Sequence, residues 1–567
     1  MIAFLIISRR SDGRSIFVQE LPSKARFASI NRQTSASVDP VKGWHLAARS
    51  DSGYNGIALD QAYSWLKSNG KRSTPVIVAV IDSGIDTLHE DLKSVLWRNP
   101  KEVPGNGIDD DKNGYVDDVH GWNFLGNPKG QNVEKDSYEA ARVYHNLRSK
   151  WDSKEVKTET LTTEERYEYE MWKRAAGEMK TQDNGMQLLM MRRAYSNFVK
   201  SDSLLRIAMS KDTFTGLQLG EFNSDAAEVK KAKSMIYGLL SANDMLETTN
   251  VEFLGEFKNY LNSEETKANA SQNPPVPYRN EIVKDEYTNF SDRNYGNNNL
   301  MVGLDAAVHG THVSGIIGAA RNNGVGMDGV ADNVQIMTLR AVPDGDEHDK
   351  DIALAIRYAV DHGARVINMS FGKSFSPEKK WVDEAVRYAE SKDVLLVHAA
   401  GNDAKNLDTT YNFPTPLLLD GGRPNNWITV GASGDPKIGG YTANFSNYGK
   451  KEVDVFAPGV KIWATVPGTN TYQFLQGTSM ASPVVAGLAA LIMEYFPKLT
   501  AAQVKQVIEQ SAQNPGENVR NPGNGEEVSL SELSRSGGII NAFEAVKLAE
   551  SLKGGRKAKT PSTKKAF

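Results

Sequence analysis

Cysteine is absent from the 567 residues of this chain. Disulfide bonds, a thiolate nucleophile and cysteine-ligated zinc are therefore excluded, although the compartment is not, because exported bacterial proteins often lack cysteine too. A strong charge of either sign is also missing, since the formal net charge is −4 at pH 7. Without a basic field, nothing indicates that the protein binds nucleic acid.

Long apolar runs are also missing. The apolar run at residues 2–7 is too short to span a bilayer, and Arg9 and Arg10 follow it. A secretory signal carries its positive charge before the apolar core, so either the protein has no standard signal or the assigned start is misplaced. No other stretch approaches membrane-spanning length, and we expect no membrane span.

The composition that is present is typical of a globular protein, with 40% hydrophobic and 24% charged residues. Runs rich in β-branched residues predict buried strands at 75–81, 334–342, 365–369, 394–400 and 427–430. Helical patterns lie between or after them, at 351–362, 381–390 and 500–511. This alternation predicts an α/β fold with a mostly parallel sheet, whose functional residues lie at the carboxyl ends of strands. Asp82, Ser370 and Asn402 all fall at such ends.

The stretch G-T-S-M-A-S-P, residues 477–483, places Ser479 where a loop is expected to turn into a buried helix. Pro483 suits a first helical turn, where its missing N–H costs nothing. A helix start directs free N–H groups and partial positive charge at whatever lies before it, which suits a nucleophile whose reaction develops negative charge. A buried helix with a serine N-cap is the alternative interpretation.

A second unusual stretch, H-G-T-H-V-S-G at 309–315, places His309 near the start of a tightly packed helix. Zinc binding by His309 and His312 is disfavoured, because helical zinc motifs need histidines four residues apart and a nearby Glu. A serine hydroxyl needs an imidazole to take its proton, and the imidazole needs a carboxylate to fix its tautomer. Ser479, His309 and Asp82 supply these groups if the fold brings them together.

Three blocks in order resemble the signatures of subtilisin-like serine proteases, the subtilases: V-I-D-S-G at 80–84, H-G-T-H-V-S-G at 309–315 and G-T-S-M-A-S-P at 477–483. Each block alone is moderately specific, whereas three in the family's Asp, His, Ser order are very specific. The resemblance covers residues 74–124 and about 290–548. It implies a subtilisin-like three-layer fold and hydrolysis of polypeptide substrates through an acyl-enzyme, with no cofactor for catalysis.

Under this resemblance, Asp82 orients the imidazole, His309 is the general base and then acid, and Ser479 is the acylating nucleophile. A-A-G-N at 399–402 matches the family block that ends in the oxyanion-hole asparagine. The Asn402 side chain and the Ser479 backbone N–H are therefore expected to bind the oxyanion of the tetrahedral intermediate.

Two further segments are implied in substrate binding. N-M-S-F-G at 368–372 resembles the segment that holds the peptide as an added strand, which implies contacts from Ser370, Phe371 and Gly372. The opposite wall of the pocket for the residue before the cut is implied to consist of Ala399, Ala400 and Gly401.

An acidic loop at 107–118 has the opening of an EF-hand-type calcium loop, D-x-D-x-N-G. The candidate ligands are Asp109, Asp111, Asn113 and Asp117, which is at the ninth position. The twelfth position is His120 and not the usual Glu, so Asp118 is expected to close a shortened cage. The prediction is a structural Ca²⁺ ion, and the alternative is a solvated acidic turn.

The predicted domain organisation follows from these motifs and from a change in composition. Residues 134–272 are rich in Glu, Lys, Met and Asn, with apolar residues at helical spacing, and predict a helical insertion. The catalytic domain is predicted at 46–133, with the Asp block and the acidic loop, and at 273–552, with the His and Ser blocks. An arm or residual pro-segment is predicted at 1–45, and a disordered basic tail at 553–567.

Two alternatives to an active serine endopeptidase remain open. One is a catalytically silent subtilase fold used as a binding protein, which the intact Asp82, His309, Ser479 and Asn402 disfavour. The other is a partner-activated protein whose cleft is blocked by the 134–272 insertion, which could also contact a pro-segment or partner. Export to the cell surface, periplasm or medium is expected from the resemblance, because most bacterial subtilases are exported.

Overall fold

The computed structural model describes residues 42–152, 156–181, 185–242, 245–246 and 248–556. The chain divides into two compact units. One contains Tyr144–Lys154 and Trp172–Pro275, and the other contains Pro40–Val143, Glu155–Met171 and Val276–Phe567. Most of the predicted N-terminal arm and basic tail lies outside the described residues.

A seven-stranded sheet with the order β2-β3-β1-β4-β5-β6-β7 forms the centre of the larger unit. All its pairings are parallel. Its strands are β1 (Val76–Asp82), β2 (Gly121–Asn123), β3 (Val334–Arg340), β4 (Val366–Met369), β5 (Leu395–Ala399), β6 (Trp427–Ser433) and β7 (Val455–Pro458). The predicted α/β fold with a mostly parallel sheet is confirmed. The edge strands β2 and β7 were not predicted as strands, because three or four residues show no clear periodicity.

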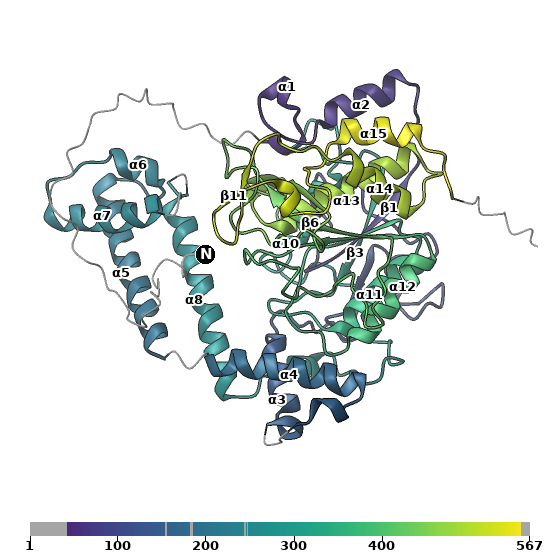
Figure 1. Cartoon of the computed structure of the whole chain (residues 1–567), viewed down its shortest axis with the longest axis horizontal. Coiled ribbons are helices and arrows are strands. Elements are labelled where there is room, and N and C mark those ends of the chain that lie inside the picture. The colour runs from purple at the N-terminus through teal and green to yellow at the C-terminus, as the bar shows by residue number, and fades with distance from the viewer. Residues whose placement is uncertain (1–41, 153–155, 182–184, 243–244, 247, 557–567) are drawn as a thin grey trace, which may run out of the picture. The chain divides into compact units, whose positions relative to one another are not determined.

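Helices cover both faces of this sheet and make a three-layer fold (Figure 1). Side chains alternate along β1, so Val78 and Val80 join one hydrophobic cluster and Ala79 and Ile81 join the other. The first cluster includes α2 (Leu59–Ser68), α10 (Val308–Gly318), α13 (Thr478–Tyr495), α14 (Ala501–Ser511) and α15 (Ala542–Ser551). The second includes α11 (Asp349–Asp361) and α12 (Lys379–Ser391).

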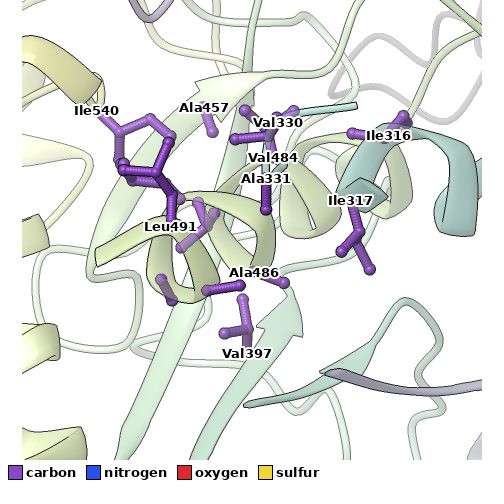
Figure 2. Close-up of a cluster of buried hydrophobic side chains, with 14 of the residues drawn as sticks. Ile316, Ile317, Val330, Ala331, Val397, Ala457, Val484, Ala486, Leu491 and Ile540 are labelled. Carbon is purple, nitrogen blue, oxygen red and sulfur yellow. The ribbon is translucent and has the colours of Figure 1, made fainter. Parts of the chain in front are cut away.

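Helix α13 is the central core helix of this unit, and Figure 2 shows Val484, Ala486 and Leu491 among its neighbours' side chains. Its length and apolar composition would also suit a membrane span, but 89% of it is buried inside the protein. Small residues allow close packing, since a Cβ added at Gly487 would lie 2.6 Å from the Val330 Cβ. The helix therefore serves as a packing element of the fold.

The predicted position of Pro483 in a first helical turn is wrong, because α13 already begins at Thr478. Proline has no N–H to donate to the carbonyl four residues earlier, which here belongs to Ser479. The hydroxyl of Ser370 takes over that role and donates to the Ser479 carbonyl at 2.9 Å. A contact from another segment thus compensates for a proline inside the helix.

Smaller elements complete this unit. Strands β8 (Ile462–Val466) and β9 (Thr471–Leu475) form an antiparallel hairpin that leads into α13, and β10 (Val519–Arg520) pairs with β11 (Glu527–Val528). Short helices lie at Trp44–Leu46 (η2), Arg49–Ser52 (α1), Thr158–Thr160 (η3), Tyr278–Ile282 (α9) and Leu530–Glu532 (η4).

The other unit is helical. It contains α5 (Gly185–Met209), α6 (Gly216–Glu221), α7 (Ala227–Ala242) and α8 (Asn250–Gln272), together with parts of α3 (Glu139–Trp151) and α4 (Thr163–Thr181). Phe198, Phe253 and Phe257 pack in its core. On α5, Met191 and Phe198 are buried, whereas Val199 is 40% exposed.

Candidate active site

Asp82 and His309 meet at the carboxyl end of the sheet. Asp82 is the last residue of β1 and is buried, and His309 is the second residue of α10. The His309 Nδ1 lies 2.8 Å from the Asp82 Oδ1, which also accepts the Ser83 N–H at 2.7 Å. Only glycine fits at Gly310, because an added Cβ would lie 2.0 Å from the Gly84 carbonyl oxygen. This close approach brings the imidazole to the carboxylate.

The environment of His309 changes its acidity in two opposite ways. Burial lowers the pKa of the imidazole, whereas the charge of Asp82 and the hydrogen bond to it raise the pKa, and the net pKa lies above its usual value of 6.5. The Asp82 contact also assigns the Nδ1 proton, because a carboxylate only accepts hydrogen bonds. The Nε2 atom of the neutral ring is then free to accept a proton.

Ser479 is the second residue of α13 and is half-buried. Its hydroxyl donates to the Ser370 carbonyl at 3.0 Å, and among the described residues it makes no hydrogen bond to His309. Helices α10 and α13 pack against each other, so the two side chains belong to adjoining elements. Hydrogen bonds between catalytic groups often become well aligned only when substrate binds.

Asn402 and the start of α13 face a common space. The Asn402 Oδ1 accepts the Thr478 N–H at 2.8 Å and the Thr478 hydroxyl at 2.9 Å, which fixes the amide and leaves its Nδ2 as the outward donor. A Cβ added at Gly477 would lie 3.4 Å from the Asn402 Nδ2 and 3.6 Å from the Ser479 backbone N. The Asn402 amide and the Ser479 backbone nitrogen therefore both lie beside Gly477.

The predicted substrate-pairing segment directly follows β4. Ser370 is buried, Phe371 is half-buried, and Gly372 is exposed. The Ser370 hydroxyl accepts from the Asn368 Nδ2 at 2.9 Å while it donates to the Ser479 carbonyl. The Phe371 carbonyl is hydrogen-bonded to the buried His398 ring at 2.8 Å. Side-chain contacts thus fix this segment against Ser479.

A residue that the sequence did not indicate, Asn412, contacts the predicted opposite wall. Its Nδ2 donates to the carbonyls of Ala399 at 3.1 Å and Ala400 at 3.0 Å. A Cβ at Gly372 would lie 2.2 Å from its Oδ1, and one at Gly401 would lie 3.5 Å from its Nδ2. Asn412 therefore lies between the two predicted walls, in a stretch with no recognisable motif.

The acidic loop forms a cluster that differs from the predicted ligand set. Carboxylate oxygens of Glu102, Asp109 and Asp111 lie within 4.8 Å of one another. Glu102 is buried, and its Oε2 has no hydrogen-bond partner among the described residues. Hard oxygen ligands and an unpaired buried carboxylate oxygen fit a Ca²⁺ ion.

The other predicted ligands have hydrogen-bond partners of their own. Asp117 accepts the backbone N–H groups of Gly105 and Gly107 and thereby holds the preceding turn. Asp118 is buried and accepts from the Asn99 Nδ2 and the Tyr358 hydroxyl. The Asn113 Nδ2 donates to Asp118 as well.

Three comparisons relate the chain to known proteins. The subtilase family model matches residues 73–526. A thermophilic serine proteinase of Bacillus sp. (strain AK1) is 42% identical over 212 residues, which are 37% of this chain and 48% of that protein. Subtilisin DY of Bacillus licheniformis is 38% identical over 216 residues, which are 38% of this chain and 73% of that protein.

A protease of Pseudoalteromonas arctica PAMC 21717 of known structure is 29% identical, with a TM-score of 0.33, over 42% of this chain and 70% of that chain. The chain thus spans about half the length of the Bacillus sp. proteinase and nearly three quarters of the length of subtilisin DY. The family model covers well over half of the chain and includes all three predicted motif blocks. The chain therefore belongs to the subtilase family of serine endopeptidases.

Proposed function

We propose that the chain hydrolyses peptide bonds through an Asp82–His309–Ser479 triad and an acyl-enzyme. The observation that carries this proposal is the 2.8 Å contact between the His309 Nδ1 and Asp82, beside a helix start that presents Ser479. The contact holds the Nε2 atom of His309 in the acceptor form that a general base needs.

In the proposed mechanism, the Ser479 hydroxyl leaves the Ser370 carbonyl and turns toward His309. The Ser479 Oγ attacks the substrate carbonyl carbon while the His309 Nε2 takes its proton, and the oxyanion accepts from the Asn402 Nδ2 and the Ser479 N–H. The imidazolium then protonates the departing amine as the C–N bond breaks. Water repeats the sequence on the ester, with His309 again taking a proton, and releases the carboxylic acid.

For substrate binding, we propose that an extended peptide pairs with the backbone of Ser370, Phe371 and Gly372. The side chain before the cut would enter between this segment and the wall of Ala399, Ala400 and Gly401. Asn412 lies between the two walls and is proposed as the floor of this slot. A polar floor so close to the walls favours small or medium side chains.

We also propose a structural Ca²⁺ ion at the acidic loop, held by Glu102, Asp109 and Asp111 with backbone or water oxygens completing its shell. This set keeps Asp109 and Asp111 from the sequence prediction and adds Glu102. The two positive charges of the ion would offset most of the negative charge of three carboxylates, and the ion would take no part in the chemical steps. The predicted ligands Asn113, Asp117 and Asp118 would support the loop through hydrogen bonds instead.

The domain assignment stays a proposal, with the 134–272 insertion as a helical module flanked by two parts of the catalytic domain. Export is also proposed, supported by the relatives, one of which is a cell wall-associated protease of Bacillus subtilis. A contact of the insertion with a partner or pro-segment stays a prediction.

Fluorophosphonate labelling tests the catalytic proposal, because this reagent modifies only an activated serine. Wild type should be labelled, and Ser479→Ala and His309→Ala should not be. Thermal melting of the variants serves as a check of folding. Absence of labelling at every pH and calcium concentration in a folded wild type would overturn the proposal in favour of a silent binding protein.

A further inference from the structure

Lys373 directly follows the proposed substrate-pairing segment, yet its side chain is buried. Its backbone pairs with Phe413, donating N–H to O at 3.1 Å and accepting at 2.8 Å. Phe413 is next to Asn412, the proposed floor of the slot. Lysine side chains are ordinarily exposed to solvent, so the burial of this one calls for a reason.

The ammonium group of Lys373 has three partners from other parts of the chain. It lies 2.8 Å from the Glu139 Oε2, 2.8 Å from the Asp349 Oδ1 and 2.8 Å from the Glu347 carbonyl oxygen. These contacts use all three of its N–H donors. Burial lowers the pKa of Lys373, but Asp349 and Glu139 raise it, and the net pKa lies well above the ordinary value. The group therefore stays charged.

Glu139 belongs to the flank of the 134–272 insertion that lies in the larger unit. It forms a two-oxygen contact with Arg142, at 3.2 Å and 2.8 Å. Arg142 also donates to the carbonyls of Ser137 at 2.7 Å and Asp346 at 3.0 Å. The flank thus reaches Lys373 as a rigid, fully bonded group.

The flank that follows the insertion is tied to helix α11, which also carries Asp349. Asp349 begins α11, and two residues later Asp351 pairs with Arg279 at 2.6 Å and 3.0 Å. Arg279 in turn holds Asp285 through two hydrogen bonds of 2.8 Å. Both flanks of the insertion therefore converge on the first turn of α11, and Lys373 is the link from there to the substrate segment.

We propose that Lys373 is a positioning residue, which ties the end of the 370–372 segment to the flank of the insertion at Glu139 and so fixes the backbone that pairs with extended substrates. This inference rests on the proposed protease function. Removing one partner from a buried ion cluster leaves the other charge uncompensated, so the segment shifts instead of relaxing in place. The insertion then influences substrate binding through its flank, without reaching the reacting atoms.

The test compares two substrates in Lys373→Met. A tetrapeptide anilide spans the 370–372 segment, whereas an N-acetyl amino-acid ethyl ester reaches little beyond the cut. We expect the KM for the anilide to rise about tenfold, the effect of lost uniform binding, with kcat and ester hydrolysis nearly unchanged. Lys373→Arg should recover part of the loss, because it keeps the charge.

Lys505→Met is the matched control for stability alone. Lys505 is another largely buried lysine, paired with Asp454 at 3.0 Å and with the carbonyl of Trp427 at the amino end of β6, away from the site. The substitution Lys505→Met should lower the melting temperature and leave the KM values for both substrates unchanged. If Lys373→Met does not fold, Glu139→Gln removes the same ion pair from the other side and should raise the anilide KM in the same direction.

The outcomes separate this inference from the proposed function. An unchanged anilide KM in a variant that still hydrolyses the ester would refute the role of Lys373 alone, and would reduce it to a structural ion pair like Lys505. A folded wild type that does not hydrolyse the ester would refute both proposals.

Discussion

Ser370 and Ser479 are joined by two reciprocal hydrogen bonds. The Ser370 hydroxyl donates to the Ser479 carbonyl at 2.9 Å, and the Ser479 hydroxyl donates to the Ser370 carbonyl at 3.0 Å. The first bond replaces the N–H that Pro483 lacks, and the second holds the Ser479 hydroxyl near the 370–372 segment. The 370–372 segment and the start of α13 are thereby fixed to each other.

Ser370→Ala should destabilise the protein by about 1 kcal/mol, because it leaves the part-buried Ser479 carbonyl without its side-chain donor. Ser482→Ala is the comparison, since this buried hydroxyl donates to the Asn368 Oδ1 at 2.8 Å and, among the described residues, makes no hydrogen bond to Ser479. Urea denaturation measures stability, and active-site titration measures the fraction of reactive serine. Equal effects of the two substitutions on serine reactivity would contradict the special role of the Ser370 bond.

Asn402→Ala should lower kcat by about 10²–10³, the loss known for an oxyanion donor in subtilisin itself, with little change in KM. The reason is that the Asn402 Nδ2 meets the oxyanion only as it forms. Steady-state kinetics on a peptide anilide separates the two parameters. A change confined to KM would remove Asn402 from this role.

The activity should decline in acid with a midpoint above 6.5, because the net pKa of His309 is raised and its protonated ring cannot accept the proton of Ser479. Asp82→Asn removes the charge that raises this pKa, so the midpoint should move to lower pH. Its rate should fall by about 10⁴, as for the triad aspartates of subtilisin and trypsin. The profile of kcat/KM between pH 5 and 9 is the measurement, and a flat rate down to pH 5 would exclude His309 as the base.

Asn412→Gly should deepen the slot and shift the preference before the cut toward large aromatic residues. Removal of the Asn412 side chain makes room for a larger substrate side chain, whose added apolar contact is worth about 1–3 kcal/mol or 10–200-fold in kcat/KM. The measurement is the ratio of kcat/KM for tetrapeptide anilides that end in Phe and in Ala. A ratio unchanged from wild type would place Asn412 outside the pocket.

Calcium should raise the melting temperature and chelation should lower it, since a ligand that binds only the folded state adds about 2.7 kcal/mol at 100 times its Kd. Glu102→Gln should weaken this response. Asp110→Asn should retain it, because the Asp110 carboxylate binds the Val103 N–H and the Asn106 amide in the same loop and lies outside the cluster. If calcium shifts the melting temperature equally in Glu102→Gln and wild type, the proposed ion site at Glu102 is contradicted, and the acidic loop is a solvated turn.

Local patterns in the sequence were sufficient for most of the fold. β-branched runs predicted β1, β3, β4 and β5 to within two residues, because a buried parallel strand is apolar on both faces. The helical pattern predicted at 500–511 is confirmed as α14, whose start is fixed by a capping box of Thr500 and Gln503 that satisfies N–H groups within one turn. The three motif blocks sufficed for the family, which the family model confirms.

Other features depend on contacts between distant segments. The early start of α13 needs a hydroxyl from Ser370 to satisfy the carbonyl that Pro483 leaves unpaired. Glu102 joins Asp109 and Asp111 only through a turn that local spacing does not reveal.

The sequence by itself determined which residues are chemically able to act, because motif spacing and periodicity are local properties of the chain. Only the tertiary structure decided which of them meet. Asp82 and His309 are 227 residues apart, and parallel strands with helices packed on both faces bring them to 2.8 Å. The contacts of Asn412 and of Lys373 arise in the same way, since both side chains meet residues from distant segments that the fold places beside them.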